Sequence, residues 1–413
     1  MESSVFRVGV NAGEANVSNR VGSNTYAYKL LVELEKQTRT QHETVGPVDH
    51  ETEVKIEWTI YLSAPPVGDM PKERAGWRYR VVTPAFLWTQ WRLPLDLFFA
   101  RQPLDVFLNL GHYAPRFCPY PSAVCVLDLG YLKFPQFFRK KDLYQLKHWT
   151  AYSVKQAKHI FTISQNSKKD IVDIYHINPA DVSIVFPGIG KGPDAVPQKD
   201  VLIAEHETLK RYDLIPHQYI VSVGTIQPRK NMINAIKAFE AFKGEREKSS
   251  QRRPAEEAGE KENLKLVFVG KPGWLTKEFD DAVAASPVKN DIIVTGFVDE
   301  DTKYALLKHA VCSVLIGYYE GFGIPAIESL LYSVTPVVAD TASLPEVVGE
   351  FGILVDPYNP EDIARGFEEA IEHQPDTQTR MQMREWAHQF SWETSAREML
   401  HVLVDTFYTK DHE

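Results

Sequence analysis

The chain has 413 residues, of which 44% are hydrophobic and 24% charged, and its formal net charge at pH 7 is −9. These values predict an ordinary globular protein of two or three domains, each able to bury a full core. No apolar run approaches the length of a membrane-spanning helix, and an acidic chain without an RNA or DNA motif argues against nucleic-acid binding.

The cysteines and the N-terminus both indicate a cytoplasmic protein. Cys118, Cys125 and Cys312 match no metal-binding spacing, and so sparse a set is typical of free thiols in a reducing compartment. The first residues, "MESSVFRVGVNAG", lack the basic region and apolar run of a signal peptide.

Charge is unevenly distributed along the chain. Residues 1–190 carry 22 Lys and Arg against 18 Asp and Glu, a net +4, whereas the remainder carries 24 against 37, a net −13. The two halves therefore bind different partners, or the difference reflects only solvated faces; the two interpretations are about equally good.

Short apolar runs rich in β-branched residues recur along the chain, and many are continuous rather than alternating. Such runs are typical of strands buried on both faces of a parallel sheet. The predicted strands are Phe6–Val10, Ile56–Leu62, Tyr79–Val82, Val106–Asn109, Ala123–Asp128, His159–Ile163, Val182–Phe186, Tyr219–Val223, Leu264–Val269, Ile292–Thr295, Cys312–Ile316, Thr335–Ala339 and Gly352–Val355.

Helical patterns lie between these runs, and strands alternating with helices predict a doubly wound α/β sheet. The pattern occurs twice, with a Gly- and Pro-rich join at Phe186–Asp200. We predict one domain over residues 1–190, a second over 191–390, and a C-terminal helix over 391–413 that packs back on the first. The predicted helices include Tyr26–Leu34, Asn166–Tyr175, Met232–Phe242, Thr302–His309 and Glu361–His373.

Two polar insertions interrupt this pattern. Lys243–Glu262 has 12 charged residues in 20 and no large apolar one, so we expect a solvated loop there. Gln41–Thr52 is a second such segment.

The stretch "YYEGFGIPAIESL", Tyr318–Leu330, follows a predicted buried strand and opens a helix. Pro325 suits the first helical turn, so Glu320 falls on the loop and Glu328 one turn into the helix. A helix N-terminus of this kind binds anions through free N–H groups and the positive end of the dipole. Without further features, the turn is equally well explained as an ordinary helix start. The amides at the helix N-terminus belong to Phe322, Gly323 and Ile324.

A second loop, in "VGTIQPRKN", also follows a buried strand and opens a helix. It carries Thr225, Arg229 and Lys230, and the last two are fixed cations where a diphosphate would need them. Because both stand on a loop, we expect them to matter more for turnover than for stability. The alternative is a pair of surface charges without a ligand.

These segments resemble the retaining, GT-B-fold glycosyltransferases of family four, within the glycosyl transferases of group 1. The resemblance implies two Rossmann-like domains that face each other across a cleft, the first for the acceptor and the second for a nucleotide-sugar donor. It covers nearly the whole chain and is carried by "DLGYLKFPQFF", "AKHIFTISQNSKKDI", "VGTIQPRKN", "TGFVDEDTKYALLKHA", "YYEGFGIPAIESL" and "VTPVVADTASLPEVVGEFGILVDPYNPEDIA".

The resemblance implies a role for each matching position. Glu328 would hold the ribose hydroxyls, Glu320 would contact the donor sugar near the reacting centre, and Arg229 and Lys230 would clamp the diphosphate. The amides of Phe322, Gly323 and Ile324 would bind sugar hydroxyls or the diphosphate, Val298 would lie beside the base, Thr225 would help to bind the donor, and Gly22 would lie under the phosphates.

Two positions depart from the family pattern. Leu127-Asp128 stands where the family usually has His-Asp, and the missing histidine normally touches the donor sugar. His112 is a candidate substitute, and Asp128 could orient an acceptor hydroxyl or merely cap the next segment. Ile316-Gly317 replaces a usual Pro-Ser.

The expected function is retaining transfer of a hexose, with mannose a candidate, from a GDP- or UDP-sugar to a glycan or lipid-linked acceptor. We identify no Asp-x-Asp motif and expect neither a metal nor a cofactor beyond the donor itself. The alternatives are a nucleotide-sugar epimerase of the same fold and a non-catalytic nucleotide-sugar binding protein.

Weak peripheral membrane contact through the first domain is a further hypothesis. Trp88–Gln102 and Phe134–His159 place basic residues among aromatics, as at a headgroup interface. Buried aromatics beside a solvated basic face would produce the same sequence.

Overall fold

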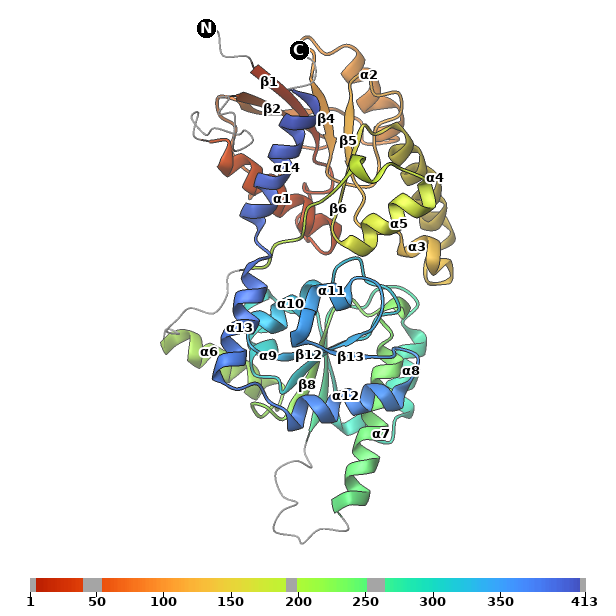
Figure 1. Ribbon diagram of the computed structural model, residues 1–413, viewed down its shortest axis with the longest axis vertical. Coiled ribbons are helices and arrows are strands. Elements are labelled where there is room, and N and C mark those ends of the chain that lie inside the picture. The colour runs from red at the N-terminus through yellow and green to blue at the C-terminus, as the bar shows by residue number, and fades with distance from the viewer. Residues whose placement is uncertain (1–4, 40–53, 191–198, 251–263, 409–413) are drawn as a thin grey trace. The chain divides into compact units, whose positions relative to one another are not determined.

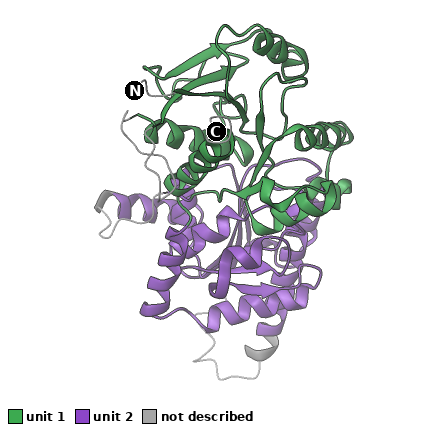
Figure 2. Ribbon diagram, turned by 45° about the horizontal axis from the view of Figure 1, so that its top comes forward, with its two compact units in different colours: residues 1–188, 390–413 green, residues 189–389 purple. Residues whose placement is uncertain are grey.

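The structure, a computed structural model, describes residues 5–39, 54–190, 199–250 and 264–408. The chain divides into two compact units, which are coloured separately in Figure 2. Unit 1 comprises residues 1–188 and 390–413, and unit 2 comprises residues 189–389. The division lies within two residues of the boundaries expected from the sequence.

Unit 1 contains a seven-stranded parallel sheet with helices on both faces (Figure 1). All seven predicted strands form; those over Val106–Asn109, Ser122–Cys125 and His159–Thr162 are buried throughout, whereas the edge strand Trp77–Val81 is mostly exposed. Their order across the sheet is β3 (Trp77–Val81), β2 (Lys55–Leu62), β1 (Val5–Asn11), β4 (Val106–Asn109), β5 (Ser122–Cys125), β6 (His159–Thr162) and β7 (Val182–Ile184).

The helices of unit 1 include the three predicted ones, together with one long helix and several short elements that the sequence patterns did not indicate. They are α1 (Ser23–Gln37), η1 (Trp88–Arg92), α2 (Leu93–Phe98), α3 (Gly130–Lys133), η2 (Pro135–Phe137), α4 (Lys140–Gln156), α5 (Gln165–Tyr175), η3 (Pro179–Asp181) and the C-terminal α14 (Trp392–Phe407).

The C-terminal helix α14 packs on α1, as expected from its amphipathic pattern. The ring of Trp392 meets that of Tyr26 edge-on, with centroids 5.7 Å apart. The Gln37 side chain donates a hydrogen bond of 2.7 Å to the carbonyl oxygen of Glu393. The Ser391 hydroxyl accepts from the Thr394 amide and so caps the helix. The last helix of the chain therefore completes the core of unit 1.

Unit 2 contains a six-stranded parallel sheet, and all six predicted strands form. The order is β10 (Ile292–Gly296), β9 (Lys265–Val269), β8 (Tyr219–Val223), β11 (Cys312–Leu315), β12 (Thr335–Ala339) and β13 (Ile353–Val355). Its helices are α6 (Lys199–Arg211), η4 (Pro228–Lys230), α7 (Met232–Ser250), α8 (Lys277–Ala285), η5 (Lys289–Asp291), α9 (Glu300–Lys308), α10 (Ile324–Leu331), α11 (Leu344–Val348), η6 (Gly349–Phe351), α12 (Pro360–Glu372) and α13 (Thr377–His388).

The expectation of a loop over Lys243–Glu262 is wrong for its first part, because α7 continues to Ser250. The charged side chains at the start of this extension have partners: Lys243 pairs with Asp291 at 3.0 Å, and the Arg246 guanidinium lies 4.7 Å from the Phe242 ring centroid. Charge density alone therefore did not end the helix. Residues 251–263, and the predicted insertion at Gln41–Thr52, lie outside the described residues.

Both sheets reverse their strand order at one point, between β1 and β4 in unit 1 and between β8 and β11 in unit 2. Loops that leave two such strands at their carboxyl ends diverge to opposite faces, which opens a crevice for ligands. The two stretches "VGTIQPRKN" and "YYEGFGIPAIESL" leave β8 and β11, so both lie at the reversal point of unit 2.

Gly188, where unit 1 ends, packs directly against the start of α14. A Cβ at this position would overlap the backbone nitrogen of Trp392 and lie 2.7 Å from the carbonyl carbon of Ser391. We therefore expect Gly188→Ala to lower the free energy of unfolding of unit 1 by about 1–3 kcal/mol, the usual cost of overpacking. Urea unfolding of the full chain measures the change. Gly68→Ala is the matched control, because a Cβ there would meet nothing within 4 Å, and equal midpoints for both variants would contradict the expectation.

Candidate functional site

The loops after β8 and β11 are joined to each other at the reversal point of unit 2. The Tyr318 amide donates to the carbonyl oxygen of Arg229 at 3.0 Å. Asn231, in the left-handed conformation with φ 58°, is buried and donates its side-chain amide to the carbonyl oxygens of Ile316 at 3.1 Å and Pro357 at 2.7 Å. One asparagine therefore ties together the loops that follow β8, β11 and β13. The sequence analysis did not single it out, although asparagine tolerates this conformation better than most residues.

Glu320, Arg229 and Lys230 form one buried ion-paired cluster. The Glu320 carboxylate lies 2.7 Å from Lys230 Nζ and 3.3 Å from an Arg229 guanidinium nitrogen. Arg229 also donates to the carbonyl oxygen of Tyr319. Only 4% of the Glu320 surface is exposed. The structure therefore brings together three residues that the sequence placed on separate loops, about 90 positions apart.

The electrostatics of the cluster favour an ionised carboxylate. Burial raises the pKa of Glu320, but the charges and hydrogen bonds of Lys230 and Arg229 outweigh burial and hold the pKa below its ordinary value. Two cations and one anion leave the cluster with one net positive charge. Because Arg229 and Lys230 compensate a buried carboxylate, they also support the fold, which revises the expectation that they matter mainly for turnover.

Gly317 has a physical explanation in this cluster. A Cβ at position 317 would lie 2.7 Å from Glu320 Oε1 and 3.2 Å from the carbonyl oxygen of Arg229. A side chain there would displace the carboxylate from its two cations. The departure from the family pattern at this position therefore makes room for the Glu320 carboxylate.

Ser343 stabilises the turn from β11 into α10 through hydrogen bonds to two backbone carbonyl oxygens. The buried Ser343 hydroxyl lies 2.8 Å from the carbonyl oxygen of Glu320 and 2.9 Å from that of Phe322. Gly323 precedes the helix with φ 106°, a conformation that side chains rarely adopt, and a Cβ there would meet Leu344. Within the described residues the amides of Gly323 and Ile324 donate to no backbone carbonyl, as expected for a first helical turn. Phe322 is buried, and only Ile324 of the three is partly exposed.

Glu328 is buried on α10 and is already paired. Its Oε1 lies 2.7 Å from Lys303 Nζ and accepts a 3.3 Å hydrogen bond from the Tyr304 hydroxyl. Both partners come from α9, and burial, followed by the Glu328 charge, raises the pKa of Tyr304. Lys303 and Tyr304 were not identified from the sequence, although both lie in the quoted segment "TGFVDEDTKYALLKHA".

The remaining predicted donor residues of unit 2 lie near these groups along the chain. Val298 is partly buried against the core just before α9 begins. Thr225 follows Gly224, where the end of β8 approaches the loop after β9 so closely that a Cβ on Gly270 would overlap the Gly224 carbonyl.

Unit 1 has its own group of polar residues at the reversal between β1 and β4. Gly22 is exposed at the N-terminus of α1 with φ 54°, and a Cβ there would meet nothing within 4 Å. The adjoining carboxylate of Glu14 accepts hydrogen bonds from Asn24 at 2.7 Å and Ser23 at 3.3 Å. An exposed glycine therefore precedes α1, and its place under the donor phosphates stays a prediction.

Leu127, Asp128 and His112 lie at the carboxyl ends of β4 and β5. Leu127 is buried, and Asp128 accepts a 2.9 Å hydrogen bond from the amide of Gly130, the first residue of α3. Burial lowers the pKa of His112, while the charges of Asp128 and Glu14 act to raise it. The buried His112 Nδ1 forms no hydrogen bond to any described residue. The structure therefore brings His112 beside Asp128, and its role as a substitute for the family histidine stays a prediction.

The statement that the chain has no Asp-x-Asp motif is wrong. The motif occurs just before and at the start of α9, where Asp299 and Asp301 flank Glu300. Asp299 accepts a hydrogen bond from the Thr302 amide at 2.7 Å and so caps α9. Among residues 5–39, 54–190, 199–250 and 264–408, no group of three or more His, Cys, Asp or Glu is placed to hold a metal ion. Metal independence stays a prediction.

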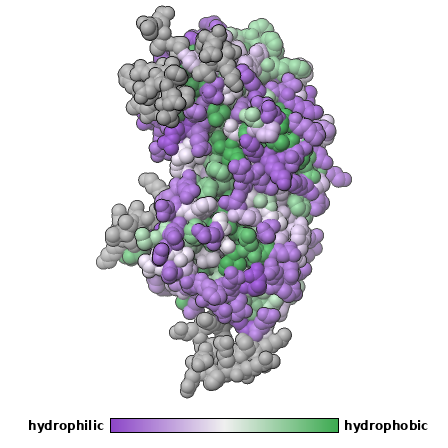
Figure 3. Space-filling view, in the orientation of Figure 1, coloured by the Kyte–Doolittle hydropathy of each residue, from purple (hydrophilic) through white to green (hydrophobic). Residues whose placement is uncertain are grey.

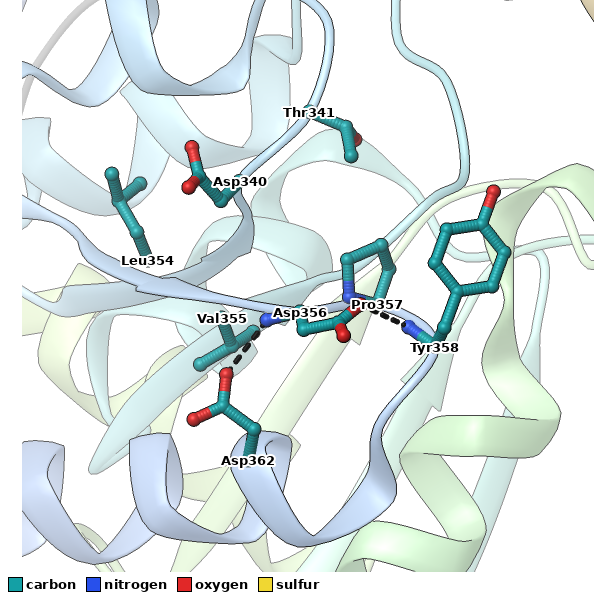
Figure 4. A pocket seen from close by; sticks show the side chains of 8 residues that line it. All are labelled: Asp340, Thr341, Leu354, Val355, Asp356, Pro357, Tyr358 and Asp362. Atoms are coloured by element: carbon teal, nitrogen blue, oxygen red, sulfur yellow. Dashed lines mark hydrogen bonds between the residues drawn. The ribbon is translucent and has the colours of Figure 1, made fainter.

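A pocket of about 320 Å³ opens beside the ends of β12 and β13 (Figure 4). Three carboxylates, Asp340, Asp356 and Asp362, line it together with the exposed ring of Tyr358. Asp362 accepts from the Asp356 amide at 2.7 Å, and Asp356 accepts from the Tyr358 amide at 2.9 Å. An acidic lining repels a diphosphate, so this pocket is not where a nucleotide's phosphates would bind.

Part of unit 2 matches a known protein family. Residues 214–390 match the family described as Glycosyl transferases group 1. This region is therefore similar to the group 1 glycosyl transferases. The matched residues include every member of the ion-paired cluster and both glutamates of the "YYEGFGIPAIESL" stretch.

Named relatives of the chain are similar over part of their length. O-antigen chain mannosyltransferase B of Escherichia coli is 27% identical over 278 residues, which cover 67% of this chain and 68% of the relative. The serotype-specific mannosyltransferase WbdA of Escherichia coli is 25% identical over 254 residues, which cover 61% of this chain but only 29% of WbdA. The chain therefore matches under a third of the WbdA protein.

Solved structures confirm the fold of the chain. Sucrose-phosphate synthase from Thermosynechococcus elongatus has a TM-score of 0.68 at 14% identity, covering 97% of this chain and 99% of that one. HepE from Anabaena, in a structure titled as a complex with UDP-glucose, has a TM-score of 0.63 at 13% identity, covering 97% and 99%. The GT-B fold, with two Rossmann-like domains, is confirmed.

The Glu320 carboxylate should make a pH-dependent contribution to stability. We expect Glu320→Gln to lower the free energy of unfolding by about 3–5 kcal/mol at neutral pH, because two cations lose their buried partner. The folded pKa of Glu320 is lowered, so its stabilisation is present above the ordinary value of 4.5 and is lost as the pH falls through the folded pKa. The difference from the native chain should therefore shrink below pH 4.5.

Urea unfolding of both proteins at a series of pH values measures this difference. Glu278→Gln, at an exposed position on α8, is the control and should match the native chain throughout. A difference that stayed constant down to the lowest pH would show that the charge of Glu320 is not its source.

Proposed function

We propose that the protein is a retaining hexosyltransferase that moves a sugar from a nucleotide-diphosphate donor to a glycan or lipid-linked acceptor. The observation that carries this proposal is the buried cluster of Arg229, Lys230 and Glu320 beside the open N-terminus of α10. Its net positive charge and the free amides of Gly323 and Ile324 suit a diphosphate at the point where ligands bind in sheets of this order.

In the proposed reaction the bond between the sugar C1 and the diphosphate oxygen breaks, and the acceptor oxygen forms a new bond to C1 on the same face. The leaving phosphate takes the acceptor's proton, so no protein base is needed. Negative charge builds on the diphosphate as the bond breaks, and fixed cations stabilise it without reorganising. Arg229 and Lys230 supply that charge, and Glu320 holds both in place.

Glu328 binds the donor ribose in this proposal. Its carboxylate is buried, and its Oε1 accepts hydrogen bonds from Lys303 and Tyr304, which fix its orientation. A ribose hydroxyl would donate to the other oxygen of Glu328, or would displace Lys303 or Tyr304 from Oε1. Val298, at the start of α9, would then lie on the base side, with Thr225 near the phosphates.

Mannose is the hexose to test first, since several relatives carry the name mannosyltransferase. We assign acceptor binding to unit 1, where Asp128 and His112 stand at strand ends and Gly22 opens α1. We also place the enzyme in the cytoplasm, at the inner face of a membrane when the acceptor is lipid-linked. The donor is the only small molecule besides the acceptor that the proposed reaction uses.

A screen of GDP- and UDP-sugars by melting temperature tests the donor, because a ligand that binds the folded state raises its stability. Transfer to mannose-terminated acceptors is then followed by NMR of the anomeric proton. A product with the donor's anomeric configuration supports the proposal, and an inverted product contradicts the retaining mechanism. Release of an epimerised sugar would indicate an epimerase, and tight binding without transfer or hydrolysis would indicate a binding protein.

Glu328→Ala should weaken nucleotide binding by about 10- to 150-fold, because a hydrogen bond to a charged group contributes about 1.5–3 kcal/mol. Calorimetry with GDP and UDP measures the affinity, and circular dichroism checks that the variant is folded. The control is Glu361→Ala, an exposed carboxylate on α12. If the folded Glu328→Ala protein bound GDP and UDP as tightly as the native chain, Glu328 would not bind the nucleotide. Its role would then be limited to the structural ion pair with Lys303.

A further inference from the structure

Glu328 and Lys303 form an ion pair that leaves hydrogen-bonding groups of both side chains unused. Hydrophilic side chains dominate the face of the protein in Figure 3, and no described helix is long and apolar enough to cross a membrane. Glu328 is an exception among the charged residues, because only 4% of it is exposed. A carboxylate buried to this extent is stable when a cation pairs with it and hydrogen bonds occupy its remaining lone pairs. Its environment meets the first condition and only part of the second.

The side-chain hydrogen bonds that Glu328 accepts from described residues all end on one of its two oxygens. Lys303 Nζ lies 2.7 Å from Oε1, and the Tyr304 hydroxyl donates to the same atom at 3.3 Å. A carboxylate oxygen accepts about two hydrogen bonds, so Oε1 is fully used. No described residue donates a hydrogen bond to Oε2. Oε2 is therefore available to a ligand that carries a hydrogen-bond donor.

The ammonium group of Lys303 also has unused capacity. Of its three N–H groups, one serves Oε1 of Glu328. The nitrogen lies 4.2 Å from the centroid of the Tyr304 ring, which attracts the charge electrostatically. The side chain of Lys303 is 20% exposed, so a ligand can reach it. The ion pair thus offers an acceptor and spare donors side by side.

Tyr304 fixes the carboxylate from the side of Oε1. Its ring lies against that of Tyr332, with centroids 5.5 Å apart. Burial, followed by the charge of Glu328, raises the pKa of Tyr304, so the hydroxyl keeps its proton and donates. Gly190, the second residue of unit 2, leaves room for this hydroxyl, since a Cβ there would lie 2.6 Å from its oxygen. The Oε2 atom is therefore held in one place without being used by the protein.

An acceptor beside spare donors is complementary to hydroxyl groups, because each hydroxyl donates one hydrogen bond and accepts others. The position of the pair indicates which hydroxyls. Lys303 lies on α9, the helix that begins just after Val298 on the proposed base side. Glu328 lies four residues beyond Ile324, about 6 Å along α10 from the helix end that faces the proposed diphosphate. Between the base and the diphosphate of a nucleotide lies the vicinal diol of its ribose.

We propose that Lys303 is a further specificity-determining residue, which binds the ribose of the nucleotide together with Glu328. Oε2 of Glu328 accepts a hydrogen bond from one ribose hydroxyl, Lys303 Nζ donates to a ribose hydroxyl oxygen, and the ion pair between them stays intact. This inference rests on the proposed function for the presence of a nucleoside diphosphate at the site. The pair selects ribonucleotides over deoxyribonucleotides, since a missing hydroxyl leaves these groups without a partner.

The test is calorimetry of the full chain with UDP or GDP, whichever the native chain binds more tightly, and with the 2′-deoxy and 3′-deoxy analogues of that nucleotide. The native chain should bind at least one analogue about 10- to 150-fold more weakly than the ribonucleotide. In Lys303→Met the ratio of these two affinities should fall by about tenfold, because the lost side chain no longer distinguishes them. The ratio is decisive, since a change that only disturbs the fold weakens both ligands alike.

Lys277→Met is the matched control. Lys277 is exposed on α8 and pairs with Asp281 at 3.0 Å, so its loss should leave both affinities at their native values. Circular dichroism checks folding. If Lys303→Met does not fold, the ratio is compared between Glu328→Gln and Glu328→Gln/Lys303→Met, neither of which contains a buried carboxylate without its cation. The double variant should then discriminate about tenfold less than Glu328→Gln.

Three results would overturn the inference, and they differ in what they say about the proposed function. If removal of Lys303 weakens ribonucleotide and deoxyribonucleotide equally, Lys303 contacts a phosphate or only supports Glu328. If the native chain binds the nucleotide and both analogues with the same affinity, the pair reads no ribose hydroxyl, while the proposed function stands. If the native chain binds neither UDP nor GDP, the proposed function is contradicted together with this inference.

Discussion

The pairing of Glu320 with Arg229 and Lys230 is the interaction on which the site of unit 2 depends. A buried carboxylate is unstable unless opposite charges compensate it, and here the compensation comes from the loop of a neighbouring strand. The same pairing orients both cations toward the reversal point of the sheet. Gly317 leaves room for the carboxylate, and Ser343 holds the turn that carries it. A change at any of these positions would disturb the two cations without touching a ligand.

Both glutamates of the "YYEGFGIPAIESL" stretch are ion-paired within unit 2, Glu320 with two cations and Glu328 with Lys303. Groups that protein contacts already hold need less reorganisation to bind a ligand. Under the proposed function, a ribose would compete with Lys303 for Glu328 or use the second carboxylate oxygen. The cluster of Arg229, Lys230 and Glu320 differs from Glu328 because it keeps one net positive charge. An anionic ligand would neutralise this charge.

Unit 1 follows another constraint, the balance between its core and its exposed surface. The segment from η1 to α2 packs Trp88, Leu93 and Leu97 inward, yet leaves its other side as apolar as its core side. The same unit replaces the family histidine by the buried Leu127 and brings His112 beside Asp128. The two units thus differ in how far their sites follow the family pattern.

Much of the fold followed from local patterns. The continuous apolar runs predicted all thirteen strands, and the glycines, prolines and charges after two of them located the loops that carry Glu320, Arg229 and Lys230. The predicted end of α7 was wrong, because Lys243 and Arg246 have ion-pair partners, Asp291 and Glu368, that lie elsewhere in the folded unit. Composition describes how polar a segment is, but whether its charges find partners depends on packing.

The sequence by itself determined which residues stand at strand ends, since strand and helix periods and turn residues are local properties. Only the tertiary structure decided which of them meet. Glu320 and Arg229 are 91 positions apart, and the parallel order of β8 and β11 is what makes them neighbours. Tertiary structure also decided three other sets of contacts. These are the pairing of Glu328 with Lys303 and Tyr304, the bonds of Ser343 to the turn, and the bonds of Asn231 to the neighbouring loops. Whether Trp91 and Phe99 were core or surface was also undetermined locally, because an apolar helix looks the same in sequence whichever side the sheet covers.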